Sequence, residues 1–291
     1  MRVTNKMMID NALYNVMKNS EELYELQGIL ASNKKINKPS DNPLDAVRIL
    51  NYRGTMNSLE QYQKNIDQAN SWLSYNESIL GSIDSLIVKS KELAVTQSST
   101  TASDSTRETS AELVKNIREQ IISYANSQWR DRYLFGGYQT QNPPFQSDGS
   151  FLGDNGVFQV PIDKNVSLVI NIDGSQLFKS GVDIFQTLQE FETALRSNDT
   201  ATIRNKITEL NSFLDQVISA RAEVGVKVNR LDSTKSSLDN RNFTITEQLS
   251  SIENADMAYA ITQYESQYLT YEASLTSATK VMQTNIVDYL R

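Results

Sequence analysis

The placement of proline constrains this chain of 291 residues more than any other feature of its sequence. The five prolines fall in two short regions, at Pro39 and Pro43 and at Pro143, Pro144 and Pro161. Because proline breaks the interior of a helix, the proline-free tracts 44–142 and 162–291 are the places where long helices can form. The glycines are also concentrated outside these tracts' long helical parts, since seven of the 11 lie between Gly136 and Gly181. The middle of the chain is therefore expected to hold turns and strands.

Apolar residues recur at a period near 3.5 in both tracts, which predicts two long helices paired along a coiled-coil-like seam. In the first tract, whose helix is expected from residue 44 to the high nineties, the positions are Leu59, Tyr62, Ile66, Ala69, Leu73, Asn76, Leu80, Ile83, Ile87, Ser90 and Ala94. In the second they are Ile203, Ile207, Leu210, Leu214, Val217, Arg221, Val224, Val228, Leu231, Lys235, Leu238, Asn242, Ile245, Leu249 and Ile252. Arg221, Lys235 and Asn242 interrupt this second seam. They either set the register or contact a neighbouring subunit, or they lie where a partly exposed seam lets long side chains reach water.

The two ends of the chain, residues 5–32 and 255–290, are amphipathic but lack a partner within their own half of the sequence. A two-helix pair alone buries too little apolar surface to offset the cost of ordering it. We therefore predict that the ends pair with each other, that they are mobile in the free chain, and that neighbouring subunits cover them in an assembly. The predicted assembly interface consists of Ile9, Leu13, Val16, Leu23, Leu30, Ile261, Tyr264, Tyr268, Tyr271, Leu275 and Met282.

A break is expected between the first helix and the second. The turn-forming residues are Asn37, Pro39, Ser40, Asp41, Asn42 and Pro43. Asp41 or Asn42 is expected to cap the next helix, with Pro43 in its first turn. The cluster of Lys34, Lys35 and Lys38 beside this turn is either a solvated loop or the neighbour of a negative group.

The central part predicts a small inserted β domain at 138–180, with strands at 157–162 and 166–172 separated by turn residues. A helix with Leu113, Ile117, Ile121 and Tyr124 on one face precedes it, and a short helix around Ile184–Leu195 follows it. Because the insert lies outside both heptad tracts, the helical body is expected to survive its removal. Gly225 lies inside a helical tract, where we expect it to permit close approach of another helix.

Composition excludes several classes of function. The chain contains no cysteine and no histidine, so it lacks thiolate sites, disulfides and the commonest general base. We predict no enzymatic activity, no cofactor and no metal; a carboxylate site in the insert is the enzymatic alternative. The net charge of −7 argues against a nucleic-acid binder. No apolar run is long enough to span a membrane, and the residues after Met1 lack the apolar stretch of a cleaved signal peptide.

Several segments resemble bacterial flagellar axial proteins of the flagellin family, and among these the hook–filament junction proteins. The resemblance is carried by residues 1–8, by the turn 36–43, by the stretch 133–140 and by the tail 264–291. Within these and the second heptad tract, the family motifs contain Phe135, Gly136, Gly137, Arg221, Gly225, Asn229 and Arg230. One departure is Ser32-Asn33, which stands before the basic pair where the family usually has Ser-Gly.

The resemblance implies a mainly α fold, an elongated coiled-coil-like bundle of long helices from both ends of the chain with a small inserted β domain. It implies terminal assembly helices at 1–43 and 255–291, a helical rod domain at 44–137 and 181–254, and the insert at 138–180. It also implies a secreted subunit of the flagellum that adapts the hook to the filament. The implied partners are hook-associated protein 1, flagellin, further copies in a ring, and the flagellar type III export apparatus with its chaperone. The alternatives are a flagellin that builds the filament itself and a cytoplasmic coiled-coil scaffold.

Overall fold

The computed structural model describes residues 5–99 and 102–289 of the chain. It contains, in chain order, α1 (Asn5–Ser32), α2 (Pro43–Gln97), α3 (Asp104–Ala125), β1 (Gln128–Trp129), β2 (Arg132–Tyr133), β3 (Gln159–Asp163), β4 (Val166–Val169), α4 (Gly174–Phe178), α5 (Ile184–Arg196), α6 (Thr200–Glu253) and α7 (Met257–Tyr289). Two compact units are present, one formed by residues 1–58 and 240–291 and the other by residues 59–239. None of the helices among the described residues is both long and apolar enough to cross a membrane.

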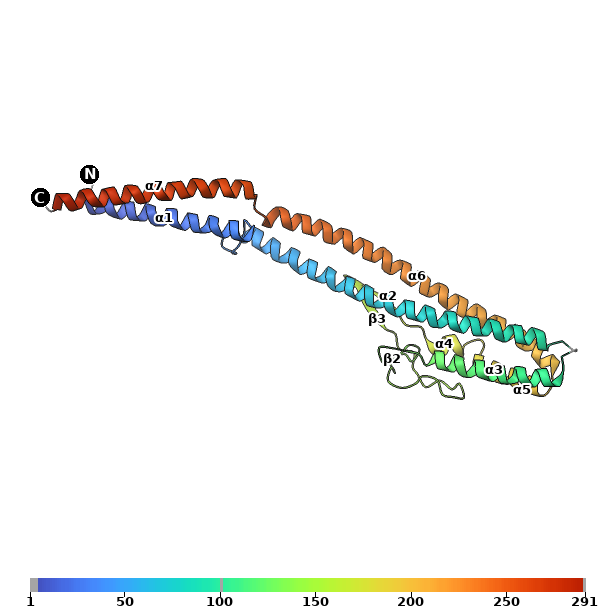
Figure 1. The fold of residues 1–291 in the computed structure, drawn as a ribbon. Coiled ribbons are helices and arrows are strands. Elements are labelled where there is room, and N and C mark those ends of the chain that lie inside the picture. Colours follow the sequence, from blue (N-terminus) through green and yellow to red (C-terminus); the bar gives the residue numbers. More distant parts are fainter. Residues whose placement is uncertain (1–4, 100–101, 290–291) are drawn as a thin grey trace. The chain divides into compact units, whose positions relative to one another are not determined.

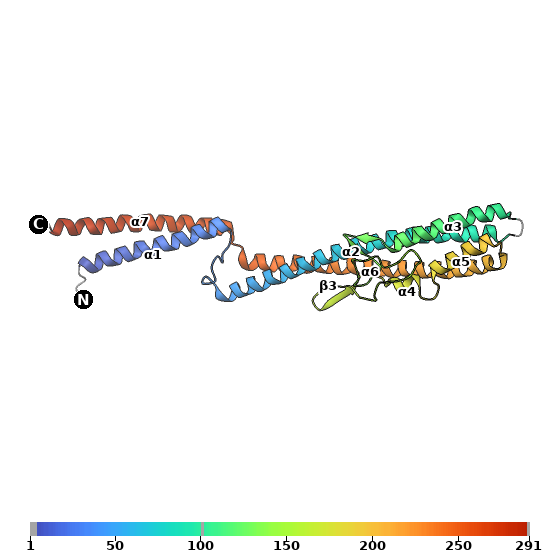
Figure 2. The same ribbon diagram turned by 90° about the horizontal axis from the view of Figure 1, so that it is seen from below.

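In the unit 59–239, α2 and α6 lie side by side and are joined by α3 and α5 (Figures 1 and 2). The predicted seam of α2 is its buried face, because Leu59, Ile66, Leu73, Leu80, Ile83 and Ile87 are each at most 1% exposed. Leu210, Val217, Leu231 and Leu238 of α6 are fully buried as well. The heptad pattern therefore identified the buried face of α2 and part of that of α6, where Ile207, Leu214 and Val228 are only half-buried.

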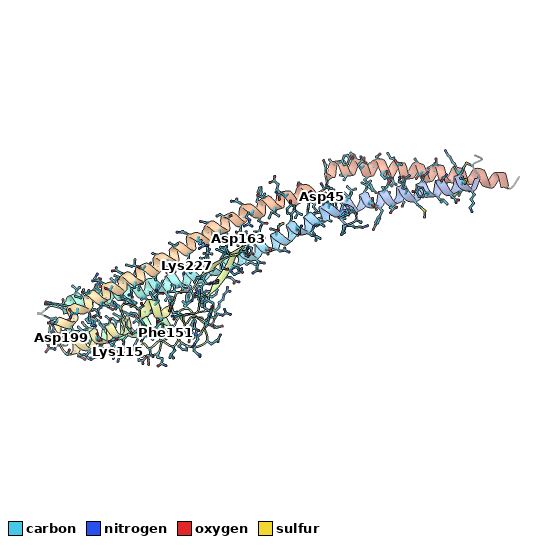
Figure 3. The ribbon with its side chains drawn as sticks, turned by 180° about the vertical axis from the view of Figure 1, so that it is seen from behind. Asp45, Lys115, Phe151, Asp163, Asp199 and Lys227 are labelled. Carbon is cyan, nitrogen blue, oxygen red and sulfur yellow. The ribbon has the colours of Figure 1, made fainter. Side chains whose placement is uncertain are left out.

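Short polar side chains determine where several helices begin. The Asp183 carboxylate accepts hydrogen bonds from the first amides of α5, and Asp256 does the same for α7. Asp199, between α5 and α6 (Figure 3), accepts from the amides of Ala201 and Thr202 at 3.1 Å. Each carboxylate satisfies amides that have no partner within the helix, and its charge suits the positive helix end.

The insert 138–180 holds the antiparallel hairpin β3–β4 and the short helix α4, and a second small antiparallel hairpin, β1–β2, precedes it. The strands β3 and β4 are shorter than the segments 157–162 and 166–172 that the sequence predicts, and Asp163 lies at the end of β3 (Figure 3). An amide of α2, Asn65 Nδ2, donates to the Pro161 carbonyl oxygen at 2.8 Å and attaches β3 to that helix.

Phenylalanine side chains join the insert to the helices. Phe145 and Phe178 of the insert have ring centroids 5.3 Å and 5.7 Å from that of Phe185 in α5, and Phe178 is 6.3 Å from Phe213 in α6. All four rings are at most 2% exposed. The insert thus shares one hydrophobic core with the helices. We therefore no longer expect the helical body to keep its stability when the insert is removed.

The buried face of α3 differs from the prediction at one position. Ile117 and Ile121 are buried as expected, but Leu113 is 40% exposed. Val114 and Ala111 are buried instead, on the same face as Ile117 and Ile121.

Candidate assembly surfaces

The unit formed by residues 1–58 and 240–291 is built on the pairing of the two ends of the chain. Helices α1 and α7 pack against each other (Figures 1 and 2). Gln267 of α7 donates through Nε2 to Glu22 Oε2 of α1 at 2.8 Å, and Gln27 Nε2 donates to the Tyr264 hydroxyl at 3.3 Å. The predicted partnership of the two ends is therefore confirmed.

The eleven residues predicted as an assembly interface remain largely open within the single chain. Among them only Leu23 is buried, at 9% exposed. The half-buried ones are Ile9, Val16, Leu30, Tyr264, Tyr271 and Met282, and the exposed ones are Leu13, Ile261, Tyr268 and Leu275. The rings of Tyr264 and Tyr268 stack with centroids 6.4 Å apart. The role of these residues in subunit contacts stays a prediction.

Further apolar residues on α1 enlarge this exposed surface. Met17 is 73% exposed, Tyr24 is 70% exposed and Tyr14 is 66% exposed. A groove of about 500 Å³ lies beside them, lined by Val16, Met17, Ser20, Glu21 and Tyr24 of α1 and by Tyr271 of α7. Contiguous exposed apolar surface of this kind marks protein interaction sites.

A third row of exposed apolar residues, at the start of α2, was not predicted from the sequence. Leu44, Val47 and Leu50, in the first two turns of α2, are 66%, 57% and 65% exposed. They repeat every three residues on the helix and so share one face. The signal was present in the sequence, but the heptad frame begins only at Leu59, and these residues precede it.

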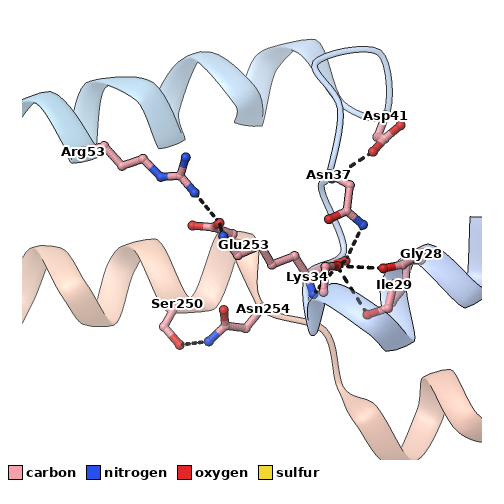
Figure 4. Close-up of polar contacts among 10 residues, drawn as sticks. Gly28, Ile29, Lys34, Asn37, Asp41, Arg53, Ser250, Glu253 and Asn254 are labelled. Carbon is pink, nitrogen blue, oxygen red and sulfur yellow. Dashed lines mark hydrogen bonds and ion pairs between the residues drawn. The ribbon is translucent and has the colours of Figure 1, made fainter.

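The segment between α1 and α2 is fixed to the end of α6 by a buried carboxylate (Figure 4). Glu253 has a side chain only 6% exposed, and its Oε1 accepts from Lys34 Nζ and from Arg53 Nη2, each at 2.5 Å. Backbone bonds reinforce the contact, since the amide of Lys35 donates to the Glu253 carbonyl oxygen at 2.9 Å and that of Ala255 to the Asn33 carbonyl oxygen at 3.1 Å. We call this arrangement of Lys34, Arg53 and Glu253 the carboxylate clasp.

The clasp accounts for one lysine of the basic cluster and lowers the pKa of Glu253. Lys34 faces a negative group, so for this residue the second of the two expected explanations is right. Burial would raise the pKa of Glu253, but the hydrogen bonds and positive charges of Lys34 and Arg53 together outweigh it and hold the pKa below its ordinary value.

The turn before α2 resolves which residue caps that helix. Asn42 is the cap, because its Oδ1 accepts from the Asp45 amide at 3.2 Å. Asp41 instead closes the preceding turn, with Oδ2 accepting from the amides of Asn37 and Lys38 at 2.9 Å and 2.8 Å (Figure 4). These backbone hydrogen bonds lower the pKa of Asp41. Pro43 is the first residue of α2, as predicted, while Pro39 and Ser40 are exposed in the turn.

The Phe-Gly-Gly motif forms a structural turn in the unit 59–239. Phe135 is fully buried against Phe178, with ring centroids 5.4 Å apart. Gly137 has φ +62°, and a Cβ there would lie 2.1 Å from the Asp154 carbonyl oxygen. At Gly136 a Cβ would lie 2.6 Å from the Gln139 carbonyl oxygen. Only glycine fits either position, so both glycines serve the fold of the insert.

The residues that interrupt the second seam differ in their contacts. Arg221 joins α6 to α2, with Nη2 2.7 Å from Glu77 Oε1 and Nη1 2.6 Å from Asp84 Oδ2, and Lys235 Nζ lies 2.6 Å from Asp67 Oδ1. These contacts favour the register-setting interpretation for both. Asn242 is half-buried, and its Oδ1 has no hydrogen-bond partner among the described residues.

The remaining motif residues on α6 are exposed. Asn229 and Arg230 face outward. Gly225 is exposed, and a Cβ added to it would have no atom within 4 Å. Within the chain no neighbouring atom requires a glycine at this position, so close approach of another helix at Gly225 stays a prediction for the assembly.

Two family models match the chain. The model described as the bacterial flagellin N-terminal helical region matches residues 3–140, and that described as the bacterial flagellin C-terminal helical region matches residues 206–290. The matches include α1, α2, α3 and most of α6 and α7, and they leave the region of β3, β4, α4 and α5 between them.

Individual proteins are similar to the chain over nearly all of its length. Flagellar hook-associated protein 3 of Escherichia coli strain K12 is 26% identical over 307 residues, covering 96% of this chain and 96% of that protein. A flagellin of Listeria monocytogenes is 24% identical over 275 residues, covering 92% of this chain and 91% of that protein.

A solved structure shares the fold. A flagellar hook-associated protein of Vibrio parahaemolyticus superimposes with a TM-score of 0.70 at 19% identity, over 74% of this chain and 100% of that one. An identity this low speaks for the fold alone.

Proposed function

The chain belongs to the flagellin family, and from that membership we propose that it is a structural subunit of the bacterial flagellum, exported from the cell, that adapts the hook to the filament. The observation that carries the proposal is the pairing of α1 with α7, which leaves Met17, Tyr24 and Tyr268 exposed. A subunit whose two ends form one exposed apolar surface is suited to association with further subunits.

The comparisons favour the junction role over that of a filament subunit. The hook-associated protein of Escherichia coli is both more similar in sequence and matched over more of its length than the Listeria flagellin.

The partners of such an adaptor are components of the hook and of the filament. We further propose hook-associated protein 1 on the hook side, flagellin on the filament side, other copies of this chain in a ring, and an export chaperone that holds the chain before secretion. In this proposal residues 1–43 and 255–291 form the inner part of the assembly, 44–137 and 181–254 the surrounding helical part, and 138–180 an outward-facing insert.

Deletion of the gene tests the proposal directly. A junction adaptor predicts cells that carry hooks without filaments, seen by electron microscopy, together with flagellin released into the medium. Reintroducing the intact gene is the control and should restore filaments. Cells that keep full-length filaments after the deletion would contradict the proposal.

The flagellin alternative is kept because a flagellin is 24% identical to the chain. A filament subunit polymerises alone, so purified protein seeded with short filament fragments would grow long filaments. A junction adaptor would stop after a short addition. Detection of the protein on sheared flagella separates both from a scaffold that remains in the cytoplasm.

A further inference from the structure

A cavity of about 400 Å³ lies in the unit 59–239, between α2, the β1–β2 hairpin and β3. Its walls are aromatic, and they include Trp72 of α2, Trp129 of β1 and Phe158 next to β3. Trp72 and Trp129 meet edge to face with ring centroids 5.6 Å apart, and Phe158 is 6.3 Å from Trp72. Packing of the insert onto α2 therefore creates a site that neither element has alone.

One wall residue carries an unpaired donor. Trp72 is only 6% exposed, and its Nε1 is buried with no hydrogen-bond partner among the residues the structure describes. Buried indole N–H groups usually have an acceptor, and leaving such a donor unpaired is costly. The indole of Trp72 therefore packs against the cavity without a hydrogen bond to any described residue.

Two arginines supply positive charge to the same cavity. Arg130 and Arg132 both line it, and Arg130 Cζ lies 4.4 Å from the centre of the Trp129 ring. Neither guanidinium forms an ion pair within the described part of the chain, whereas Arg221 of the same unit pairs with two carboxylates. Asp131 separates them in sequence at the turn, but it does not line the cavity.

We propose that this cavity binds a carboxylate side chain from an acidic segment of a neighbouring protein chain in the flagellum, an inference that rests on the proposed function. A guanidinium fork matches a carboxylate through two parallel hydrogen bonds. The stacking of Arg130 on Trp129 restrains that guanidinium before binding, and both arginines are exposed, so a carboxylate can reach them from solvent. An acidic partner is supported by charge complementarity, since neither cavity arginine forms an ion pair among the residues that the structure describes.

The chain offers a selective reporter for this site, because it contains two tryptophans and both line the cavity. The probe is an acetylated, amidated pentaglutamate peptide added to the full-length chain at low salt, with pentaglutamine as its uncharged match. We expect pentaglutamate to shift the tryptophan emission and at least one of the two indole N–H resonances saturably. The shift should weaken as sodium chloride is added, because exposed charges are screened.

Variants locate the effect. Arg130→Gln and Arg132→Gln should each weaken pentaglutamate binding about 10- to 100-fold, the range expected for losing a hydrogen bond between charged groups. Arg230→Gln is the matched control, since Arg230 is an exposed arginine of the same unit that lies outside the cavity. It should bind pentaglutamate as the unaltered chain does.

Three results with the purified protein would overturn the inference. The first is no change in emission or resonances up to 10 mM pentaglutamate, and the second is an equal response to pentaglutamine. The third is inorganic phosphate binding as tightly as the peptide, which would make the cavity a general anion site. A strain that carries both Arg130→Gln and Arg132→Gln should have fewer filaments per cell. If that strain has normal filaments while the deletion strain has none, the cavity has no role in assembly. The proposed junction role would still stand.

Discussion

Replacing Glu253 by glutamine tests whether the carboxylate clasp holds the α1–α2 turn to the end of α6. The substitution keeps the size of the side chain but replaces the carboxylate, which accepts hydrogen bonds from Lys34 and Arg53 at 2.5 Å, with a neutral amide. Neutral glutamine accepts weaker hydrogen bonds from the same cations, so local opening of the turn should become easier.

The size of the effect follows from the burial of the three side chains. Removing a hydrogen bond to a charged group costs about 1.5–3 kcal/mol when the site is buried. Here the Glu253 side chain is 6% exposed but those of Lys34 and Arg53 are 40% and 49% exposed, so water compensates both cations. We therefore expect a loss of about 1–2 kcal/mol in the free energy of local opening.

Hydrogen exchange at two amides measures this opening where it occurs. The amides of Lys35 and Ala255 donate across the contact between the turn and the end of α6, so each exchanges when the contact opens. A loss of 1–2 kcal/mol corresponds to roughly 5- to 30-fold faster exchange. Glu247→Gln is the matched control, because Glu247 is an exposed glutamate of the same helix, and it should leave both rates unchanged.

Acid should act on the unaltered chain as the substitution does. The pKa of Glu253 in the folded chain lies below its ordinary value of 4.5, so the clasp contributes its full stability above that value. The contribution is lost as the pH falls through the lowered pKa, and exchange corrected for its intrinsic rate should then accelerate. Rates in Glu253→Gln that match the unaltered chain at neutral pH would refute the clasp as a stabilising contact.

Four further perturbations have defined outcomes. Gly137→Ala should lower the free energy of unfolding by about 1–3 kcal/mol in a urea melt, because alanine is strained at positive φ and its Cβ would clash; an unchanged midpoint would contradict this. Gly225→Ala should raise helix stability by about 0.5–1 kcal/mol in thermal melts, since its Cβ meets open space, and lost motility despite that gain would place another subunit against it. Deleting residues 138–180 should lower the melting temperature and increase binding of a hydrophobic dye by uncovering Phe213; an unchanged melt would show that the helices are independent after all. Deleting residues 260–291 should leave the unit 59–239 folded by circular dichroism but absent from purified flagella, and normal incorporation would argue against a role for α7 in assembly.

The helical part of the fold could be predicted because its determinants are local in sequence. Pro43 begins α2 and the row from Leu59 to Ala94 is its buried seam, since a heptad period specifies which face of a long helix is covered. The pairing of α1 with α7 also followed, because each had an apolar face without a partner in its own half.

The insert and part of the candidate surfaces could not be predicted, because they depend on contacts between distant segments. No spacing in the sequence shows that Phe178 packs on both Phe145 and Phe213. The cavity lined by Trp72 and Arg130 arises only when the β1–β2 hairpin folds back onto α2. The Phe-Gly-Gly motif was found by resemblance, but its role as a turn around Asp154 required the backbone geometry.

The two acids that hold Arg221 have a mechanical consequence. Glu77 and Asp84 are seven residues apart, which is one heptad and about 10 Å along a helix. If α6 slid past α2 by one heptad, the apolar seams would again face each other, and Arg221 would still reach one of the two acids. Apolar packing alone therefore resists such a slip weakly. The resistance comes from polar contacts such as that of Lys235 with Asp67, and one of the two ion pairs of Arg221 would also be lost in a slip. A few polar contacts would thus resist sliding of α6 along α2, while the apolar seam holds the two helices together.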